Sequence, residues 1–383
     1  MRVSVVREDA RRRWSLVGAG VAMLCVLPAV IAARPPPRTD ADPGRLRELI
    51  LASAERPYQG YVDGRGEVGL PDLPVLDEVM GLVGGSTRIR AWYASPKSWR
   101  VAVLDQTGER DLYQTAQGTY VWDFERNLLT HIVGELPARL PWAADLTPPD
   151  LARRLLRGAA PDDPLTLVPS KRVAGVAAAG LRLTPSDADT TIGHVDVWAD
   201  PATGLPVQVE VAARGSKAPV LTARFLELSQ EPPGAEVLVP AVPASAEVTM
   251  ATADDVSSTI NSFAFARLPA RIADRARVAA PAGVRGVTAV AAYGAGLSTF
   301  VVLALPGRVG FQSIQAARDA GGVAVEFPGA EAYEIQASLL AALVVRSDGD
   351  RQTRRSYLLV GPVTPDLLRR AAAELLAATR IAQ

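Results

Sequence analysis

Cysteine and histidine are both scarce in this sequence. Its 383 residues include one cysteine, Cys25, and two histidines, His131 and His194. A single cysteine excludes an intrachain disulfide, and the two counts together exclude Cys-rich zinc and iron–sulfur sites. Hydrophobic residues make up 48% of the chain, which is enough to build a large core without covalent cross-links.

An excess of either charge is also absent, since 41 lysines and arginines balance 41 aspartates and glutamates. Affinity for a nucleic acid depends on positive charge that neutralises phosphates. The balanced composition therefore predicts that no nucleic acid is a partner.

The usual catalytic motifs are missing as well. The chain has no Gly-rich loop that ends in Gly-Lys-Ser/Thr and no Gly-x-Ser-x-Gly elbow. Residues 64–69 spell the dinucleotide-binding pattern but lead into Leu-Pro-Asp-Leu-Pro, which cannot form the helix that this motif requires, so we interpret them as a Gly-rich strand or bulge. His131 and His194 lie in alternating segments with no evident nucleophile beside them. We expect no enzyme, no cofactor and no metal site, and the alternative is a hydrolase that acts through either histidine.

The N-terminus carries an export signal. Five arginines lie within residues 1–13, residues 14–33 contain no charge, and the proline-rich residues 34–43 follow as a spacer. Twenty uncharged residues are long enough for an uncleaved membrane anchor, which we favour, but Ala32 and Ala33 also suit cleavage of a signal peptide. In both cases the arginines place the N-terminus in the cytoplasm, and the bulk of the chain is predicted to be extracytoplasmic at the cell membrane.

Residues 44–235 show mainly the period of β-strands. A helix is expected at 44–55, and two more at 75–83 and 150–157. In residues 205–211 the odd positions are aliphatic and the even ones polar, which predicts one dry face and one wet face. Turn residues separate the alternating segments about every ten residues, which is typical of an antiparallel meander, sandwich or barrel. The expected strands are 87–93, 99–104, 110–115, 119–124, 128–133, 176–183, 191–199, 205–211 and 219–228.

A proline-rich break at residues 232–243 ends this pattern. Beyond it we expect strands at 287–293, 297–305, 341–345 and 356–360, and a terminal helix at 365–378. The predicted organisation is a signal or anchor segment and spacer at 1–43, a first domain at 44–235 and a smaller α+β domain at 245–383.

The segment from Val197 to Val211 resembles the LolA/RseB (MucB) superfamily. It reads Val-Trp-Ala-Asp-Pro-Ala-Thr-Gly-Leu-Pro-Val and continues with alternation, and Gly204 suits a tight turn with positive φ. Tyr58-Gln59-Gly60 and residues 119–131 fit the same superfamily, and the smaller domain is similar to that of RseB. The resemblance implies an incomplete antiparallel β-barrel that is covered by helices, with an apolar cavity for lipid between them.

Nine residues are candidates for the wall of that cavity. We chose one face of each strand, together with the apolar side of the helix expected at 75–83. A plain aromatic core stripe is the alternative for residues 120–124, and an error of one residue in register would invert the choice. The candidates are Leu76, Val79, Met80, Ile89, Ala91, Tyr93, Tyr120, Trp122 and Phe124.

The resemblance implies a non-enzymatic, membrane-tethered protein of RseB type. Its ligand would be a lipid or the acyl chain of a lipoprotein, its protein partner an anti-sigma factor, and its role the regulation of envelope-stress sigma-factor signalling. The alternative is a LolA-like lipid or lipoprotein carrier that works with an ABC-type transporter.

Overall fold

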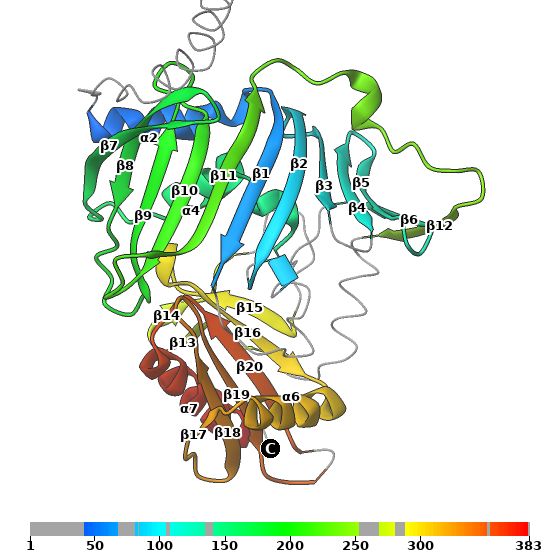
Figure 1. Ribbon diagram of the computed structural model, residues 1–383. Coiled ribbons are helices and arrows are strands. Elements are labelled where there is room, and N and C mark those ends of the chain that lie inside the picture. The colour runs from blue at the N-terminus through cyan, green and yellow to red at the C-terminus, as the bar shows by residue number, and fades with distance from the viewer. Residues whose placement is uncertain are drawn as a thin grey trace, which may run out of the picture.

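The computed structural model describes residues 42–67, 81–82, 84–104, 108–134, 141–252, 268–279, 288–350 and 353–381. The expected anchor at 14–33 and the candidates Leu76, Val79 and Met80 lie outside the described residues. Within the described ranges, no helix is both long and apolar enough to cross a membrane. The chain builds a large sheet with helices against one face, and a smaller sheet below it with a helix on either side (Figure 1).

The larger sheet has twelve strands in the order β12-β6-β5-β4-β3-β2-β1-β11-β10-β9-β8-β7. Every pair of neighbours is antiparallel except β12 and β6, which are parallel. The sheet is open, because β12 and β7 form its two edges. The strands are β1 (Tyr58–Gly66), β2 (Ser86–Ser95), β3 (Ser98–Leu104), β4 (Glu109–Thr115), β5 (Gly118–Asp123), β6 (Leu128–Val133), β7 (Leu165–Val173), β8 (Val176–Leu183), β9 (Ile192–Ala199), β10 (Pro206–Ala213), β11 (Pro219–Ser229) and β12 (Glu247–Thr252).

Alternation of side chains gives this sheet two different faces. In β2, Ile89 and Ala91 are buried, whereas Arg88 and Arg90, which alternate with them, are exposed. We call the face of the sheet that carries the Ile89 side chain the inner face, and the face that carries the Arg88 side chain the outer face. The pairing register of the strands then assigns residues of the neighbouring strands to one face or the other.

Helices cover the inner face. They are α2 (Pro43–Ala52), which η1 (Ser53–Glu55) extends, η2 (Ala143–Leu146) and α4 (Pro148–Arg157). The Asp42 side chain caps α2 by accepting a hydrogen bond from the Arg45 backbone N–H at 2.9 Å, and a proline begins α2 and α4. Leu46 and Leu156 from these helices pack with Leu181 and Val209 from the sheet in one apolar core.

The connection after β11 crosses the outer face. We call residues 230–246 the strap; it contains η3 (Ala235–Leu238) and lies against β3 and β4 before it continues into β12. Val242 and Ala246 of the strap pack against a small cluster of Tyr113, Trp122 and Leu129.

The smaller sheet has the order β15-β16-β20-β19-β18-β17 and is antiparallel. Helix α6 (Gly307–Asp319) packs with Val344 and Leu358 on one face, and α7 (Pro365–Ile381) packs with Leu343 and Leu359 on the other. Strands of this sheet are β15 (Val290–Tyr293), β16 (Phe300–Leu305), β17 (Val323–Ala324), β18 (Ala330–Gln336), β19 (Ala341–Ser347) and β20 (Ser356–Gly361); η4 (Gly296–Ser298) precedes β16, and β13 (Arg271–Ile272) and β14 (Arg275–Ala276) form a separate hairpin.

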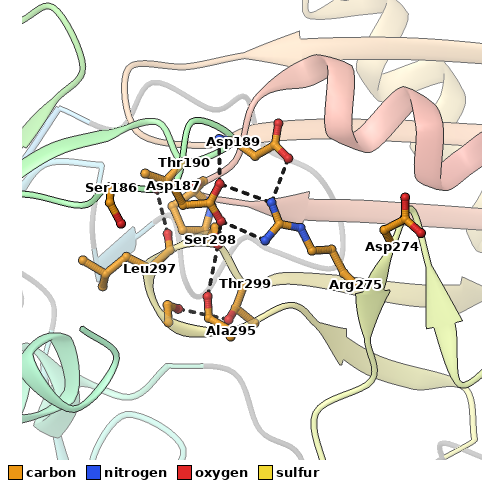
Figure 2. A network of polar contacts seen from close by, with 12 residues as sticks. Ser186, Asp187, Asp189, Thr190, Asp274, Arg275, Ala295, Leu297, Ser298 and Thr299 are labelled. Carbon is orange, nitrogen blue, oxygen red and sulfur yellow. Dashed lines mark hydrogen bonds and ion pairs between the residues drawn. The ribbon is translucent and has the colours of Figure 1, made fainter. Parts of the chain in front are cut away.

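The loop between β8 and β9 joins the two parts of the molecule (Figure 2). Arg275 bonds Asp187 at 2.8 Å and Asp189 at 2.7 Å, and the Ser298 hydroxyl donates to Asp187 at 2.6 Å. The buried Thr190 hydroxyl lies 2.7 Å from the Leu297 carbonyl. Partial burial opposes ionisation of Asp187, but the hydrogen bonds from Arg275 and Ser298 prevail and lower its pKa to about 2.

The expected fold class is confirmed. The protein is mainly β, with an open antiparallel sheet that is covered by helices and a smaller α+β part. The Gly-rich residues Gly64 and Gly66 lie in strand β1, as expected. Alternation did not identify β7, β12, β18 or α6. Residues 247–252 lie in the range that we assigned from sequence to the smaller domain, yet they pair with β6 in the larger sheet.

Candidate ligand cavity

Aliphatic and aromatic side chains line the inner face between the sheet and η2. Ile89, Val101 and Leu112 from three successive strands pack with Ala143 and Leu146 of η2. These strands pair in register, with Ile89 opposite Val103 and Val101 opposite Leu112, so their apolar side chains form a continuous layer.

A cavity of about 410 Å³ opens at the end of this layer. Val103, Leu112 and Val121 form its floor on the sheet, and Leu82 and Trp142 lie at its other side. Charged residues also border the cavity, namely Glu109, Arg110, Asp111, Asp123 and Glu125, although the carboxylate of Asp111 itself points to the outer face, toward Arg100. The arrangement offers an apolar interior with a charged rim, which is a common form of small-molecule site.

Polar groups gather where the inner face meets α4. Tyr58 and Tyr93 stack with ring centroids 4.9 Å apart, and Arg153 is 2% exposed and bonds Asp150 at 2.7 Å. Arg153 also contacts Ser53 of η1 through two hydrogen bonds of 3.4 Å. Burial raises the pKa of Tyr93 to about 12 and that of Tyr58 well above its ordinary value, so both phenols stay neutral. The two phenols are neutral and Arg153 is paired with Asp150. Their contacts hold α4 against the sheet.

The structure places the described wall candidates on two faces. Ile89, Ala91 and Tyr93 are buried on the inner face, beside the cavity but not in its lining. Tyr120 and Trp122 lie on the outer face, since Trp122 packs beneath the strap, and Phe124 is 64% exposed. The sequence-based candidates that the structure describes therefore fall into two separate groups.

The cavity residues that were not among the sequence-based candidates share one feature, their position in the register. Val103, Leu112 and Val121 occupy neighbouring strands at positions that the register aligns with Ile89 and Ala91. Alternation within a strand shows which of its residues share a face. Only the register between two strands shows which residues of the second strand lie on the same face as given residues of the first.

A second cluster, of charged and aromatic groups, lies on the outer face. Arg100 lies over the rings of Trp92 and Tyr113, with its guanidinium carbon 4.6 and 5.2 Å from their centroids. It bonds Asp111 at 2.7 Å and Glu109 at 3.1 Å. Burial raises the pKa of Asp111 to about 6, although Arg100 and the Tyr113 hydroxyl oppose the shift. The strap covers this group.

The two histidines lie on different strands and have separate partners. His131 of β6 stacks on Tyr120 with centroids 4.1 Å apart, and its Nε2 lies 3.0 Å from the Gln117 carbonyl. His194 of β9 has Nε2 3.9 Å from Asp196. In the part of the chain that the structure describes, no three His, Cys, Asp or Glu side chains are grouped as metal ligands.

Comparison with known proteins gives a likeness in fold. No family model and no curated protein matches the chain. The fold is similar to that of MucB. The structure of MucB in complex with MucA(peri) covers 86% of this chain and 97% of its own, with 16% identity and a TM-score of 0.48. The Pseudomonas aeruginosa MucA/MucB complex covers 87% and 97%, with 17% identity and a TM-score of 0.48.

A LolA-superfamily structure is also similar to part of this chain. Protein NE2245 from Nitrosomonas europaea covers 51% of this chain and 97% of its own, with 13% identity and a TM-score of 0.24.

Proposed function

We propose that this protein binds the acyl chain of a lipid or lipoprotein between the inner face and the helix layer, without catalysis, on the extracytoplasmic side of the cell membrane. The observation that carries the proposal is the cavity over Val103, Leu112 and Val121. Its volume of about 410 Å³ lies within the range of small-molecule sites. Each methylene that leaves water for such a lining contributes about 0.8 kcal/mol.

The charged rim supports a ligand with a polar end. Glu109, Arg110 and Glu125 lie beside the apolar lining, so a headgroup can remain at the rim while the chain is buried.

Occupancy of the cavity would change the affinity for a protein partner, because a ligand shifts whichever conformation it binds better. We propose an anti-sigma factor as this partner and envelope-stress regulation as the role. The runner-up is a carrier that delivers lipid or lipoprotein to an ABC-type transporter. Genes adjacent to this one discriminate the two, since a sigma/anti-sigma pair favours regulation and a transporter favours trafficking.

A bulky substitution in the cavity lining tests this proposal, and the same residue type on the opposite face of the same strand is the control. Val121→Trp of β5 adds bulk to the lining, and Tyr120→Trp adds an indole on the opposite face of the same strand. We expect Val121→Trp to weaken binding of a fluorescent fatty-acid probe at least tenfold, and Tyr120→Trp to bind it like the wild type. If Val121→Trp folds and binds with unchanged affinity, the ligand does not occupy this cavity.

A further inference from the structure

The strap crosses the outer face and is fastened by polar contacts at its two ends. At one end the Gln230 side chain donates to the Asp200 carboxylate at 2.8 Å, and at the other the Asn127 side chain donates to the Ser245 carbonyl at 2.9 Å. Among the described residues, the hydrogen bonds of residues 232–244 stay within the strap itself. The middle of the strap is therefore not hydrogen-bonded to the sheet that it covers.

Apolar side chains make the contacts between the middle of the strap and the sheet. Val242 and Ala246 pack against the cluster around Trp122, and η3 lies against β3 and β4. Within the strap only Pro233 and Leu238 are buried. Segments with few buried apolar contacts open locally at low free energy while the rest of the protein stays folded. The strap is thus suited to lift from the outer face between its two fixed ends.

Two carboxylates beneath the strap share one arginine. Arg100 of β3 bonds Glu109 at 3.1 Å and Asp111 at 2.7 Å, both on β4. Asp111 is 3% exposed, and its Oδ2 also accepts from the Tyr113 hydroxyl at 2.9 Å, whereas its Oδ1 is buried without a hydrogen-bond partner. When both carboxylates are ionised, the group has a net negative charge and one buried oxygen that no donor stabilises.

The neighbouring elements bring no second cation to Asp111. Its direct neighbours on the adjoining strands are Ala102 of β3 and Trp122 of β5, which are uncharged. Arg90 of β2 lies on the far side of Ala102 and is exposed. The strap contains no lysine, arginine or histidine, and its charged residues are Glu231 and Glu236. Closure of the strap therefore excludes water from Asp111 without supplying a compensating charge.

We propose that the strap is a pH-sensitive cover of the outer face, which is closed while the Asp111 carboxyl is protonated and opens when it ionises. Opening gives Oδ1 of Asp111 access to water, which stabilises the charge that the closed form cannot accommodate. The open form also exposes the apolar side chains of Tyr113, Trp122 and Leu129, against which the strap packs. This device acts on the opposite face of the sheet from the ligand cavity and does not depend on the proposed ligand.

The direction of the pH dependence follows from the raised pKa of Asp111. Burial raises this pKa from 3.8 to about 6 and Glu109 adds to the shift, whereas Arg100 and the Tyr113 hydroxyl oppose it. In the open form the hydrated carboxyl returns toward its ordinary pKa. The closed form thus binds the proton more tightly, so it is favoured at low pH and loses this advantage as pH rises through 6. Between pH 4 and pH 7 the ratio of closed to open strap should fall by up to about a hundredfold.

Thiol labelling of the strap tests this device. In the full chain with Cys25→Ser, Leu238→Cys places a thiol at a position of the strap that is 7% exposed, and Val239→Cys places one at the next residue, which is 60% exposed. A neutral maleimide labels both proteins at pH 5 and pH 7. Division of the rate for Val239→Cys by the rate for Leu238→Cys cancels the pH dependence of the thiol chemistry. We expect this ratio to fall about tenfold from pH 5 to pH 7.

Removal of the titrating group is the matched control. Asp111→Asn cannot ionise, and Asp111→Leu, which places an apolar side chain under the apolar side of the strap, serves if the amide disturbs the fold. In either background the labelling ratio should be the same at pH 5 and pH 7. A ratio that does not change with pH when Asp111 is present, or one that changes equally when it is replaced, would overturn the proposal.

A third thiol separates opening of the strap from unfolding of the sheet. Val209→Cys lies on β10 at a fully buried position, so it is labelled only when the larger sheet unfolds. We expect its labelling rate, again divided into that of Val239→Cys, to change less than twofold between the two pH values. A change as large as that at Leu238→Cys would assign the effect to unfolding and overturn the role of the strap.

Discussion

At the residue scale, Asp111 is a carboxylic acid that the strap and its neighbours hold away from water. Its side chain is buried, its Oδ2 accepts from Arg100 at 2.7 Å and from Tyr113 at 2.9 Å, and its Oδ1 has no hydrogen-bond partner. An ionised carboxylate with an unsatisfied buried oxygen is costly, which is why burial outweighs the arginine and raises the pKa.

The raised pKa of Asp111 makes stability depend on pH in a definite direction. The folded protein holds this proton up to about pH 6, whereas the unfolded chain releases it near pH 3.8. The stability that the group contributes is therefore present in full below the lower pKa, and is lost as pH rises toward 6. We expect the wild type to lose up to about 3 kcal/mol relative to Asp111→Asn between pH 4 and pH 7.

Urea unfolding of both proteins at the two pH values measures this difference, and every other titrating group is common to both. A difference that does not change with pH would show that Asp111 is ionised throughout.

Trp122 lies on the outer face, on the other side of the sheet from the candidate cavity. Its side chain is 7% exposed and packs with Tyr113 and Leu129 under the strap, away from the cavity lining. We expect Trp122→Ala to lower the free energy of unfolding by about 3 kcal/mol, the usual cost of a buried aromatic, and to leave the affinity for a fatty-acid probe unchanged. Phe124→Ala, at a 64% exposed position of the same face, is the control and should cost under about 0.5 kcal/mol.

Loss of probe binding by a folded Trp122→Ala protein would show that Trp122 does contribute to the ligand site. Chemical denaturation and a fluorescence titration on the same samples separate the two outcomes.

At the scale of elements, the turn between β9 and β10 fixes helix α2 against the sheet. Gly204 has φ +72°, as its place in the turn predicts, and a Cβ atom there would lie 2.2 Å from the Leu49 carbonyl oxygen of α2. Gly215 also has positive φ, +81°, but a Cβ there would meet nothing within 4 Å. The two glycines share the backbone requirement and differ only in the contact with the helix.

We therefore expect Gly204→Ala to destabilise the protein more than Gly215→Ala. Both substitutions force alanine into the left-handed region, at about 1–2 kcal/mol, and only Gly204→Ala also displaces α2. Thermal unfolding should show a distinctly lower Tm for Gly204→Ala than for its control. Equal shifts would mean that α2 moves without cost.

Alternation predicted most of these elements, because strands with one buried face carry the signal themselves. The odd positions of β10, such as Val207 and Val209, are buried as expected. The even positions do not simply face water, since Gln208 is 8% exposed and Glu210 bonds Lys171 at 2.8 Å. Lys171 comes from β7, which β8 and β9 separate from β10 in the sheet, and no local pattern could predict that approach.

One strand that escaped prediction, β12, lacks a local signal. Strand β12 is exposed at four successive positions, so it has no dry face to produce alternation. The cavity was missed for a related reason, because the choice of Tyr120 and Trp122 required the relative register of β4 and β5. Register depends on contacts between distant residues, and alternation within one strand cannot supply it.

At the scale of the whole molecule, the β8–β9 loop couples the two parts. Thr190 is buried and donates to the Leu297 carbonyl, and the backbone N–H of Thr191 donates to the Pro362 carbonyl at 3.1 Å. The apolar core also continues between them, since Ile192 and Leu339 belong to one cluster. These contacts link the unfolding of one part to that of the other.

The chain carries natural probes for this coupling. Five of the six tryptophans lie between residues 92 and 198, in the part that holds the larger sheet, the sixth is Trp14 near the N-terminus, and none lies in the smaller sheet, so indole fluorescence does not report the smaller sheet, whereas circular dichroism reports both. If the parts unfold together, the two signals give coincident transitions. We expect coincidence for the wild type at pH 7.

Arg275→Gln and Thr190→Val should separate the two transitions, each with its own pH dependence. Arg275→Gln removes the partner of Asp187 and should cost about 1 kcal/mol, because the pair is partly exposed. The pKa of Asp187 is lowered to about 2, so this stabilisation is present above about pH 4 and is lost as pH falls toward 2. Thr190→Val leaves a buried carbonyl unpaired and should cost about 1–3 kcal/mol at every pH. Coincident transitions in both variants at pH 7 would show that the apolar core alone couples the two parts.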